Sequence, residues 1–289
     1  MASPREIRRR IRGVRNMSQI TRALQMVAAS KMRRAQDRVT ASRPYSERLR
    51  EFIADLSAQQ MDATELQQFP LLDERPVKNT AMVLITPDRG LAGALNGNLI
   101  RHGVRYIREE SNVPTSVIAV GKKGRDFMNR TGQDIVADFI GLGDAPTLED
   151  IRPIARVAMD EFLNGNVDTV QMVYPKFVNT LTQTPELTQI LPVVRPESEI
   201  EDVDYIFEPD ATTVLREILP RYVEVLMYQA VLETVASFYS AQMVAMQNAT
   251  DNAKELSEEL DLSLNKARQA QITNEVAEIS AGANAFRED

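Results

Sequence analysis

The sequence contains no cysteine, and His102 is its single histidine. The lack of cysteine excludes disulfides, thiolate catalysis and cysteine metal sites. One histidine, in the stretch LIRHGVRYI, does not suffice for a histidine metal cluster, and a partly exposed helix position is its simplest interpretation. No apolar run approaches the roughly 20 residues that a helix needs to span a bilayer. Function therefore has to be sought in the organisation of the chain.

Helix-breaking residues are scarce in the last part of the chain. There is no glycine between Gly165 and Gly282, and no proline after Pro220. This predicts one helix from about residue 211 to 286, on the order of 110 Å long at ~1.5 Å per residue. Pro220 removes one backbone hydrogen bond and is expected to bend the helix near its start. Helices of this length indicate a coiled coil or a repeat array, and the sequence shows no internal repeat.

The N-terminal segment also has a heptad pattern, and it should be mostly helical to about residue 58. Pro44 is expected to kink or interrupt this helix. A second apolar stripe lies one position behind the heptad seam. Because a two-helix coil needs only the seam, the wider apolar arc predicts that something else surrounds this stretch. The seam residues are Ile7, Ile11, Val14, Ser18, Thr21, Gln25, Ala28, Met32, Ala35 and Val39, and those of the second stripe are Met17, Ile20, Leu24 and Val27.

The C-terminal helix has a matching seam of small and apolar residues. Its predicted members are Tyr239, Met243, Met246, Thr250, Ala253, Leu256, Leu260, Ala267, Ala270 and Ala277, with one double step across Ser263. The two ends of the chain also carry opposite charge. Residues 1–55 hold 14 Lys/Arg and 5 Asp/Glu, a net charge of +9, whereas residues 211–289 hold 6 and 12, a net charge of −6. Seams and charges together predict an antiparallel coiled coil of residues 1–58 with residues 211–289.

The middle of the chain alternates predicted strands and helices, which is typical of an α/β sheet. We therefore expect a Rossmann-like α/β domain over residues 75–195, inserted between the two coiled-coil helices. Residues 194–210 are polar and are interpreted as a connection that ends in a short strand. The predicted strands are 81–86, 115–121, 168–177 and 186–193, and the predicted helices are 99–109 and 149–163.

Two glycine-rich turns invite comparison with phosphate-binding loops. The turn PDRGLAGALNG follows a strand, but its glycines, Gly90, Gly93 and Gly97, lack the G-x-G-x-x-G spacing. The stretch GKKG (121–124) resembles part of a P-loop, but the full motif occurs nowhere in the chain. Tight turns and helix starts explain these glycines without a ligand. A nucleotide-binding enzyme remains an alternative at this point.

The arginines of residues 5–15 could contact nucleic-acid phosphates. Interleaved aromatic residues would strengthen that interpretation, but none occurs before Tyr45. Pairing with the acidic helix of the same chain is the simpler explanation. The neighbouring carboxylates Glu258 and Glu259 do not converge on one point, because consecutive helical residues face different ways. No catalytic constellation is evident, and a free-standing coiled-coil adaptor or a basic nucleic-acid-binding arm remains a rival to any mechanical role.

Several long stretches resemble one family. REIRRRIRGVRNMSQITRALQMVAASKMRRAQ (5–36), TPDRGLAGALNGNLIR (86–101), VGKKGRDF (120–127), YIFEPD (205–210) and the NATDNA and NKARQAQIT blocks within 245–285 are similar to the gamma subunit of F-type ATP synthase. The resemblance implies a non-catalytic rotor shaft that couples rotation of a membrane ring to conformational change at catalytic sites in the beta subunits. ATP is then made, or protons are pumped when the enzyme runs in reverse.

The resemblance also implies partners and a location. The shaft would stand in a ring of three alpha and three beta subunits. The globular part, with epsilon, would rest on the c-subunit ring, and delta would join through the complex. No cofactor, nucleic acid or small-molecule substrate of its own is implied. The expected place is the cytoplasmic side of a bacterial plasma membrane, as a peripheral protein.

Three surfaces follow from the same resemblance, residue by residue. A beta-lever contact is expected near the N-terminal double stripe, paired with a C-terminal block. An apolar tip is expected to turn in an upper bearing, and a foot is expected to face epsilon and the ring. The lever residues are Leu24, Gln25, Met26, Gln269, Thr273 and Glu275, the bearing residues are Ile279, Ala283 and Phe286, and the foot residues are Arg43, Pro44, Tyr45, Tyr205, Phe207 and Glu208.

The sequence departs from the family pattern at a few positions. Ala92 stands where many members have cysteine. The absence of cysteine and of a Cys-bearing insertion argues against the light-regulated chloroplast form and favours a bacterial origin. Phe238 and Gln242 replace a usual Glu and Arg, so an ion pair expected there is in doubt. Gln25 stands between Leu24 and Met26 where a carboxylate is common, which keeps the apolar contact and drops the charge.

Overall fold

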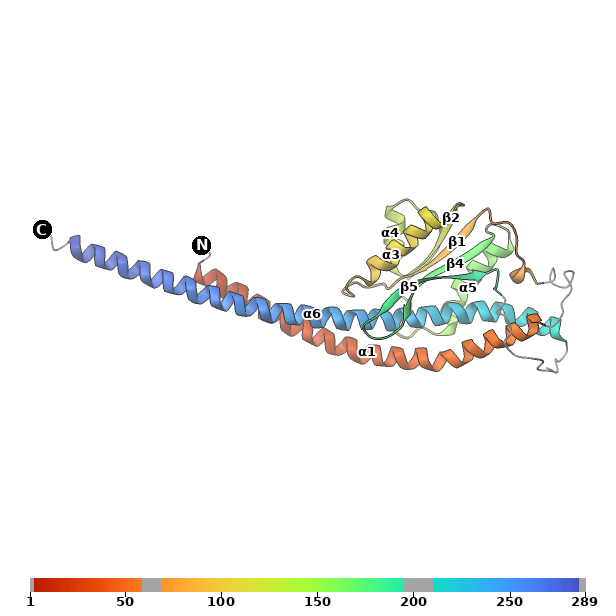
Figure 1. The fold of residues 1–289 in the computed structure, drawn as a ribbon, viewed down its shortest axis with the longest axis horizontal. Coiled ribbons are helices and arrows are strands. Elements are labelled where there is room, and N and C mark those ends of the chain that lie inside the picture. Colours follow the sequence, from red (N-terminus) through yellow and green to blue (C-terminus); the bar gives the residue numbers. More distant parts are fainter. Residues whose placement is uncertain (1–2, 59–68, 195–209, 286–289) are drawn as a thin grey trace. The chain divides into compact units, whose positions relative to one another are not determined.

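The computed structural model describes residues 3–58, 69–194 and 210–285. The chain forms two compact units. Unit 1 contains Met1–Val27 and Met243–Asp289, and unit 2 is Ala28–Gln242. Two long helices, α1 (Pro4–Ala58) and α6 (Ala211–Ala285), supply all the regular structure of unit 1 that the model describes, and they also contribute to unit 2. The α/β fold with long terminal helices is confirmed (Figure 1).

Both long helices contain a proline. Pro44 lies inside α1 and Pro220 lies inside α6, and each helix continues on both sides of it. The expected interruption at Pro44 is therefore wrong. A proline removes a single donor from the helical ladder, and the helix is otherwise sustained by its packing against neighbouring elements. In unit 2 that packing includes Val39 before Pro44 and Ile53 after it, both fully or almost fully buried.

Unit 2 contains a five-stranded sheet in the order β3-β2-β1-β4-β5. The first four strands run parallel and β5 runs antiparallel to β4. Parallel neighbours need crossover connections, and the helices between the strands provide them. The strands are β1 (Thr80–Ile85), β2 (Thr115–Val120), β3 (Ile135–Phe139), β4 (Thr169–Phe177) and β5 (Gln183–Leu191), and the connecting helices are α3 (Leu95–Arg105), α4 (Lys122–Arg130) and α5 (Leu148–Leu163). A short 3-10 turn, Pro70–Leu72, precedes the sheet, and a π-helical turn, Tyr106–Glu110, follows α3.

Helices cover both faces of the sheet, so β1 is buried along its whole length. On one face, Ala81, Val83 and Ile85 of β1 pack against α5, α6 and the end of α1. On the other face, Met82 and Leu84 pack in a smaller core with residues of α4 and of the turn after α3. Figure 1 shows α3 and α4 on one side of the sheet and α5 with α6 on the other.

The structure adds two elements that the sequence did not predict. Helix α4 follows β2 directly, and β3 forms the edge of the sheet. The burial of β3 alternates between half-buried and exposed, and Asp138 lies within it, so it lacks the apolar run that marks the inner strands. In addition, α3 begins at Leu95 rather than 99, and β5 begins at Gln183 rather than 186. The expected short strand before residue 210 lies outside the described residues.

The heptad seam of α1 is confirmed. In unit 1, Ile7, Ile11 and Thr21 are buried, and in unit 2 the same holds for Ala28 and Ala35. The intervening seam positions are half-buried. A period of seven residues therefore predicted which side of α1 is covered.

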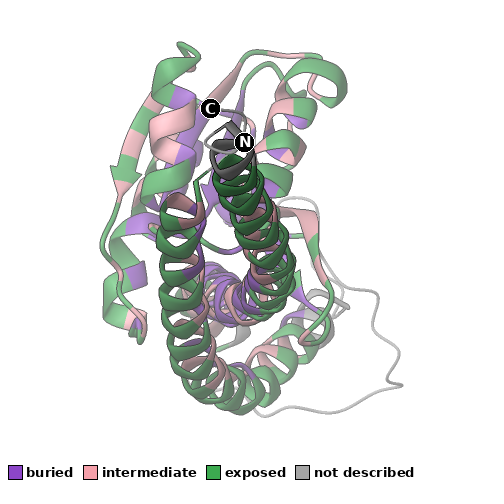
Figure 2. Cartoon of the chain, turned by 90° about the vertical axis from the view of Figure 1, so that its left-hand side faces the viewer, coloured by how far each residue is buried: buried purple, intermediate pink, exposed green. Residues whose placement is uncertain are grey.

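The seam of α6 in unit 1 differs from the prediction at two positions, Leu256 and Ala277. Ser257 is buried with 8% exposure, whereas Leu256 is 46% exposed. An unbroken heptad runs through residues 250, 253, 257, 260, 264 and 267, so the double step across Ser263 is not needed. Ala277 is exposed, as is every residue of 271–280 (Figure 2). Within the described residues, α1 (Pro4–Ala58) does not extend that far along α6.

Candidate functional site

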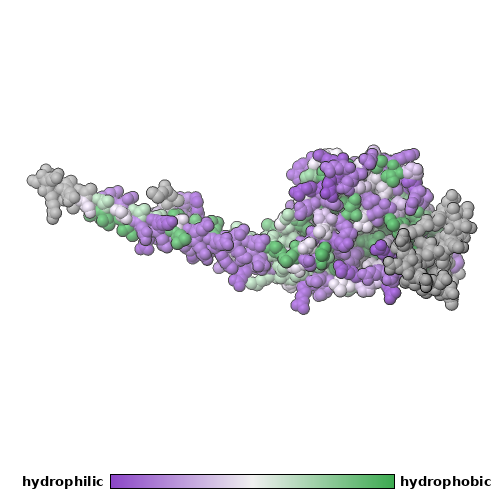
Figure 3. All heavy atoms as spheres, in the orientation of Figure 1, coloured by the Kyte–Doolittle hydropathy of each residue, from purple (hydrophilic) through white to green (hydrophobic). Residues whose placement is uncertain are grey.

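The helices of unit 1 carry large apolar side chains that nothing in the described chain covers. Met17, Ile20 and Val27 of α1 are each more than half exposed, and Met26 is 60% exposed. Figure 3 shows apolar spheres interrupting the hydrophilic surface along these helices. Exposed apolar clusters of this kind mark contact surfaces. The exposed apolar residues of α6 in this unit are Leu256, Leu262, Ile272, Val276 and Ile279.

Two threonine hydroxyls meet in the seam between α1 and α6. Thr21 Oγ1 and Thr250 Oγ1 are 2.7 Å apart and both residues are buried. Each hydroxyl also lies within hydrogen-bonding distance of a carbonyl of its own helix, Thr21 of Ser18 at 3.1 Å and Thr250 of Met246 at 2.8 Å. Because each hydroxyl has one hydrogen, one threonine donates to its own carbonyl while the other donates across the seam. The pair fixes the register, since it places residue 21 of one helix opposite residue 250 of the other.

Replacing Thr250 with valine is expected to cost about 1 kcal/mol locally, because Thr21 loses a buried partner. Amide exchange of α1 around Thr21 should become about fivefold faster. The double substitution Thr21→Val with Thr250→Val should cost less than the two single changes together, because no unpaired hydroxyl remains. Hydrogen-exchange mass spectrometry of the full chain measures this. Additive effects would show that the two hydroxyls do not depend on each other.

Opposite charge contributes less to the coil than its composition suggests. Among the described residues of unit 1, one ion pair joins the two helices, Arg15 Nη2 to Asp261 Oδ2 at 2.7 Å. Its side chains are 60% and 42% exposed, and such surface pairs are worth about 0–1 kcal/mol. Arg10 pairs with Glu6 on its own helix. Ion pairs between the two ends of the chain are thus fewer than expected, and packing at the seam contributes most of the contact between the two helices.

The expected lever residues fall into two separate groups. Leu24 and Gln25 are half-buried beside the exposed Met26, and Gln269, Thr273 and Glu275 are exposed. With residue 21 opposite residue 250, residues 24–26 lie opposite about 245–247. The block at 269–275 is then on the order of 40 Å further along α6 at ~1.5 Å per residue. The structure does not bring the two groups together, so they belong to different levels of the coil.

The other expected surfaces are only partly within the described residues. Ile279 is 72% exposed on the unpartnered end of α6. Ala283 belongs to α6, but its side chain lies outside the described set, and so does Phe286. Arg43, Pro44 and Tyr45 are exposed on α1 in unit 2. The remaining foot residues, Tyr205, Phe207 and Glu208, lie outside the described residues.

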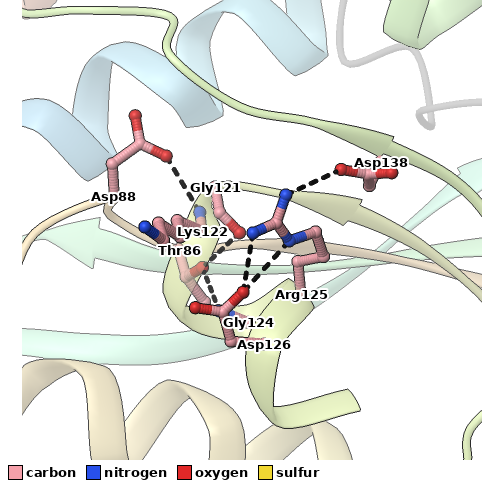
Figure 4. A network of polar contacts seen from close by, with 8 residues as sticks. All are labelled: Thr86, Asp88, Gly121, Lys122, Gly124, Arg125, Asp126 and Asp138. Atoms are coloured by element: carbon pink, nitrogen blue, oxygen red, sulfur yellow. Dashed lines mark hydrogen bonds and ion pairs between the residues drawn. The ribbon is translucent and has the colours of Figure 1, made fainter. Parts of the chain in front are cut away.

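The glycine-rich turns of the α/β domain form a closed polar network rather than an open phosphate site (Figure 4). The carboxylate of Asp88 accepts the amide of Lys122 at the start of α4 at 2.9 Å, and its second oxygen accepts the amide of Gly141 at 3.0 Å. The hydroxyl of Thr86 accepts the amide of Gly124 at 2.8 Å. The amides of Lys122 and Gly124 are the groups that would hold a phosphate at the N-terminus of α4. Because an internal carboxylate already occupies that place, a phosphate would be repelled there.

Asp88 is the residue that sequence reasoning missed in this network. It lies in the turn PDRGLAGALNG, beside the glycines that suggest a phosphate-binding loop. An acidic residue three positions after the end of a buried strand, beside a helix N-terminus, was the available signal. Its presence removes the support that the two glycine-rich turns gave to a nucleotide-binding enzyme.

Histidine and metal chemistry add no further site. His102 lies partly exposed on α3, with Arg105 Nη2 at 3.0 Å from its Nδ1. Partial burial and the charge of Arg105 lower the pKa of His102. Within residues 3–58, 69–194 and 210–285, no cluster of His, Asp or Glu is arranged to hold a metal ion. None of the helices in the same ranges combines the length and apolar character of a membrane span.

Phe238 is one of the two positions, with Gln242, at which the sequence departs from the family pattern, and the structure shows how its side chain packs. Phe238 is buried and lies edge-on to Tyr239, with ring centroids 5.1 Å apart. Such aromatic pairs add about 0.5–1.5 kcal/mol beyond the burial of their surface. Phe238 therefore makes an aromatic contact at the position where the family usually has a glutamate.

The chain is similar to known proteins over its whole length. A family model described as ATP synthase matches residues 3–286. The ATP synthase gamma chain of Roseiflexus castenholzii is 52% identical over 292 residues, with both chains fully covered. That of Dehalococcoides mccartyi is 51% identical over 287 residues, covering 99% of this chain and 100% of the relative.

The fold has a counterpart among solved structures. A chain of the Euglena gracilis mitochondrial ATP synthase, solved as an OSCP/F1/c-ring assembly, superposes with a TM-score of 0.71 and 23% identity. The match covers 98% of this chain and 94% of that chain. At this level of identity the likeness concerns the fold alone.

Proposed function

The chain belongs to the ATP synthase gamma-chain family, the central rotor stalk of F-type ATP synthase, and from this premise we propose how it acts. It is a non-catalytic subunit, because the catalytic sites of the enzyme lie in the beta subunits. We propose that the coiled coil of unit 1 is the part that turns inside the catalytic ring. Its orientation would select which beta site is open, so that rotation and nucleotide chemistry become two linked equilibria.

The observation that supports this proposal is the exposed apolar surface of unit 1. A two-helix coil that stays alone in water gains nothing from exposing Met17, Ile20, Met26 and Val27 together. In a coil that is surrounded by other subunits, these side chains are buried against those subunits. A smooth apolar surface also lets the rod turn, since it forms few directional hydrogen bonds that would have to break at each step.

The proposed surfaces are those that the family resemblance implies. Leu24, Gln25 and Met26 would contact the beta lever, and Gln269, Thr273 and Glu275 would contact the ring at a second level. Ile279, Ala283 and Phe286 would turn in the upper bearing. The proposed foot consists of Arg43, Pro44, Tyr45, Tyr205, Phe207 and Glu208. The corresponding segments are 1–58 and 211–289 for the shaft and 75–195 for the globular domain.

The proposed assembly contains three alpha and three beta subunits, epsilon, the c-subunit ring and, through the complex, delta. The chain is a peripheral subunit of a membrane-associated enzyme. We place it on the cytoplasmic side of a bacterial plasma membrane, in line with the bacterial origin of its relatives. The rotor needs no cofactor or nucleic acid of its own.

Reconstitution tests the proposed function. Purified alpha and beta subunits are combined with the full chain, and ATP hydrolysis is measured after gel filtration. A gamma rotor should join the hexamer in a ratio of one to three to three and restore cooperative hydrolysis. A free-standing coiled-coil adaptor should elute separately or leave the hydrolysis unchanged, and that result would reject the proposal.

A further inference from the structure

A group of charged and hydroxyl side chains around Asp144 lies apart from the surfaces described above. Asp144 follows β3, in the loop before α5, and it belongs to unit 2, as do all its partners. Lys31 Nζ of α1 is 2.5 Å from one carboxylate oxygen, and the hydroxyl of Tyr239 on α6 donates to the other. Arg38 of α1 donates to the backbone carbonyl of Asp144 at 2.9 Å. One loop residue therefore contacts both long helices.

The two helices also meet each other at this point. Lys31 Nζ is 3.4 Å from the hydroxyl of Tyr239 and 5.3 Å from the centre of its ring. Arg89, in the turn after β1, adds a longer ion pair of 3.6 Å to Asp144. The carboxylate of Asp144 thus joins three elements that are far apart in the sequence.

The electrostatics keep this group charged. Partial burial of Asp144 opposes its ionisation, but the hydrogen bonds from Lys31 and Tyr239 outweigh it and lower the pKa of Asp144. The same hydrogen bond to Asp144 raises the pKa of Lys31. Asp144 stabilises the folded chain fully above the pKa that its carboxyl has in the unfolded chain, and this stabilisation is lost as the pH falls through its lowered pKa in the folded chain. Lys31 stabilises the folded chain fully below the pKa that its amine has in the unfolded chain, and this stabilisation is lost as the pH rises through its raised pKa in the folded chain. Both charges therefore persist across the physiological range.

A pocket lies directly beside this group. It has a volume of about 70 Å³, is partly open to solvent, and lies between the carboxyl ends of the strands and α6, with Asp144 and Tyr239 in its lining. Its walls include Ile85, Val120 and Phe238, and the first two also belong to the apolar core on the α5 side. At this edge of the sheet, the polar contacts of Asp144 therefore add to the apolar packing that joins the sheet to α6.

We infer that Asp144 is a positioning residue that fastens the α/β domain to both shaft helices, so that domain and helices turn as one body under load. The inference rests on the proposed rotor function. Torque that enters at the foot would otherwise let α1 and α6 slide past each other or tilt away from the domain. A contact that joins both helices to a third element resists both motions.

The first test uses hydrogen exchange on the full chain with Asp144→Ala. Exchange of residues 28–38 of α1 and 235–242 of α6 should become about tenfold faster, while β1 exchanges as before. The matched control is Asp138→Asn, another carboxylate of the same domain, which pairs with Arg125 at 3.4 Å within that domain. The control should leave both helices unchanged. Unchanged exchange in Asp144→Ala would overturn the inference.

A second variant covers the case in which Asp144→Ala disturbs the fold of the domain. Lys31→Met removes the partner on α1 and alters no residue of the sheet. Amide exchange of the loop at 142–146 should become faster by a comparable factor. If this variant leaves the loop protected, Asp144 does not depend on the shaft and the inference fails.

The functional test uses the reconstituted enzyme in vesicles. Asp144→Ala should hydrolyse ATP at the wild-type rate without a proton gradient, but its proton pumping against an imposed gradient should fall at least twofold. A residue with a merely local structural role would leave the ratio of pumping to hydrolysis unaltered, and that result would reject its role in positioning. A wild-type chain that fails to couple at all would instead reject the proposed function.

Discussion

Replacing Gly121 with alanine is expected to destabilise the α/β domain by about 3–5 kcal/mol. Gly121 has φ of +92°, and an added Cβ would lie 1.7 Å from the carbonyl oxygen of Thr86. The obstacle is backbone, which cannot swing aside as a flexible side chain would. At about 2–4 °C per kcal/mol for a protein of this size, the melting temperature should fall by roughly 6–20 °C. Circular dichroism of the purified chain measures the shift.

Gly132→Ala is the matched control for this substitution. Gly132 also has a positive φ, of +69°, but nothing lies within 4 Å of its added Cβ. It should therefore cost only the conformational strain of about 1–2 kcal/mol. The difference between the two variants isolates the collision with Thr86. Equal shifts would mean that the strand ends and the start of α4 are not held as closely as the network of Asp88 and Thr86 implies.

Placing a charge on the shaft as Met26→Asp is expected to abolish coupling while sparing the fold. Met26 is 60% exposed in the free chain, so the change should alter its stability by about 0.5 kcal/mol or less. In the assembled enzyme the same side chain would face the beta lever, where an unpaired buried charge costs several kcal/mol. Proton pumping should fall at least tenfold, with a smaller loss of ATP hydrolysis. Both activities are measured on the same vesicles.

Ser263→Asp is the control for the charge itself. Ser263 is an exposed polar residue of α6 in the same unit, and it belongs neither to the exposed apolar surface nor to the proposed contact surfaces. It should leave both activities near the wild-type level. Equal loss of pumping and hydrolysis in Met26→Asp would mean that the substitution harms assembly or folding, and the lever assignment would be abandoned.

Periodicity predicted most of the seam between the long helices, and its error at Leu256 has a physical cause. The seam of α1 was correct because apolar and small residues repeat every seven positions from Ile7 to Val39. On α6 hydrophobicity alone favours the larger Leu256 as the seam residue, whereas the heptad register favours Ser257. In a seam of small residues, close helix approach favours serine at the inner position, and the leucine is left outside.

Contacts between distant parts of the chain could not be predicted in the same way. Lys31 and Asp144 are 113 residues apart, and Tyr239 and Asp144 are 95 apart. Their meeting depends on how the loop after β3 lies against α1 and α6, which no local pattern encodes. Similarly, net charge predicted attraction between the ends of the chain, but it could not show that a single described ion pair, Arg15 with Asp261, joins the helices of unit 1.

Direct observation of rotation tests the rotor function most closely. Because the chain has no cysteine, Arg43→Cys gives one labelling site on an exposed position of α1. A probe is attached there, the hexamer of alpha and beta subunits is immobilised, and the probe is followed during ATP hydrolysis. The rotor account predicts stepwise rotation in one direction, with three dwells in each turn. Sustained hydrolysis with a stationary probe would contradict it.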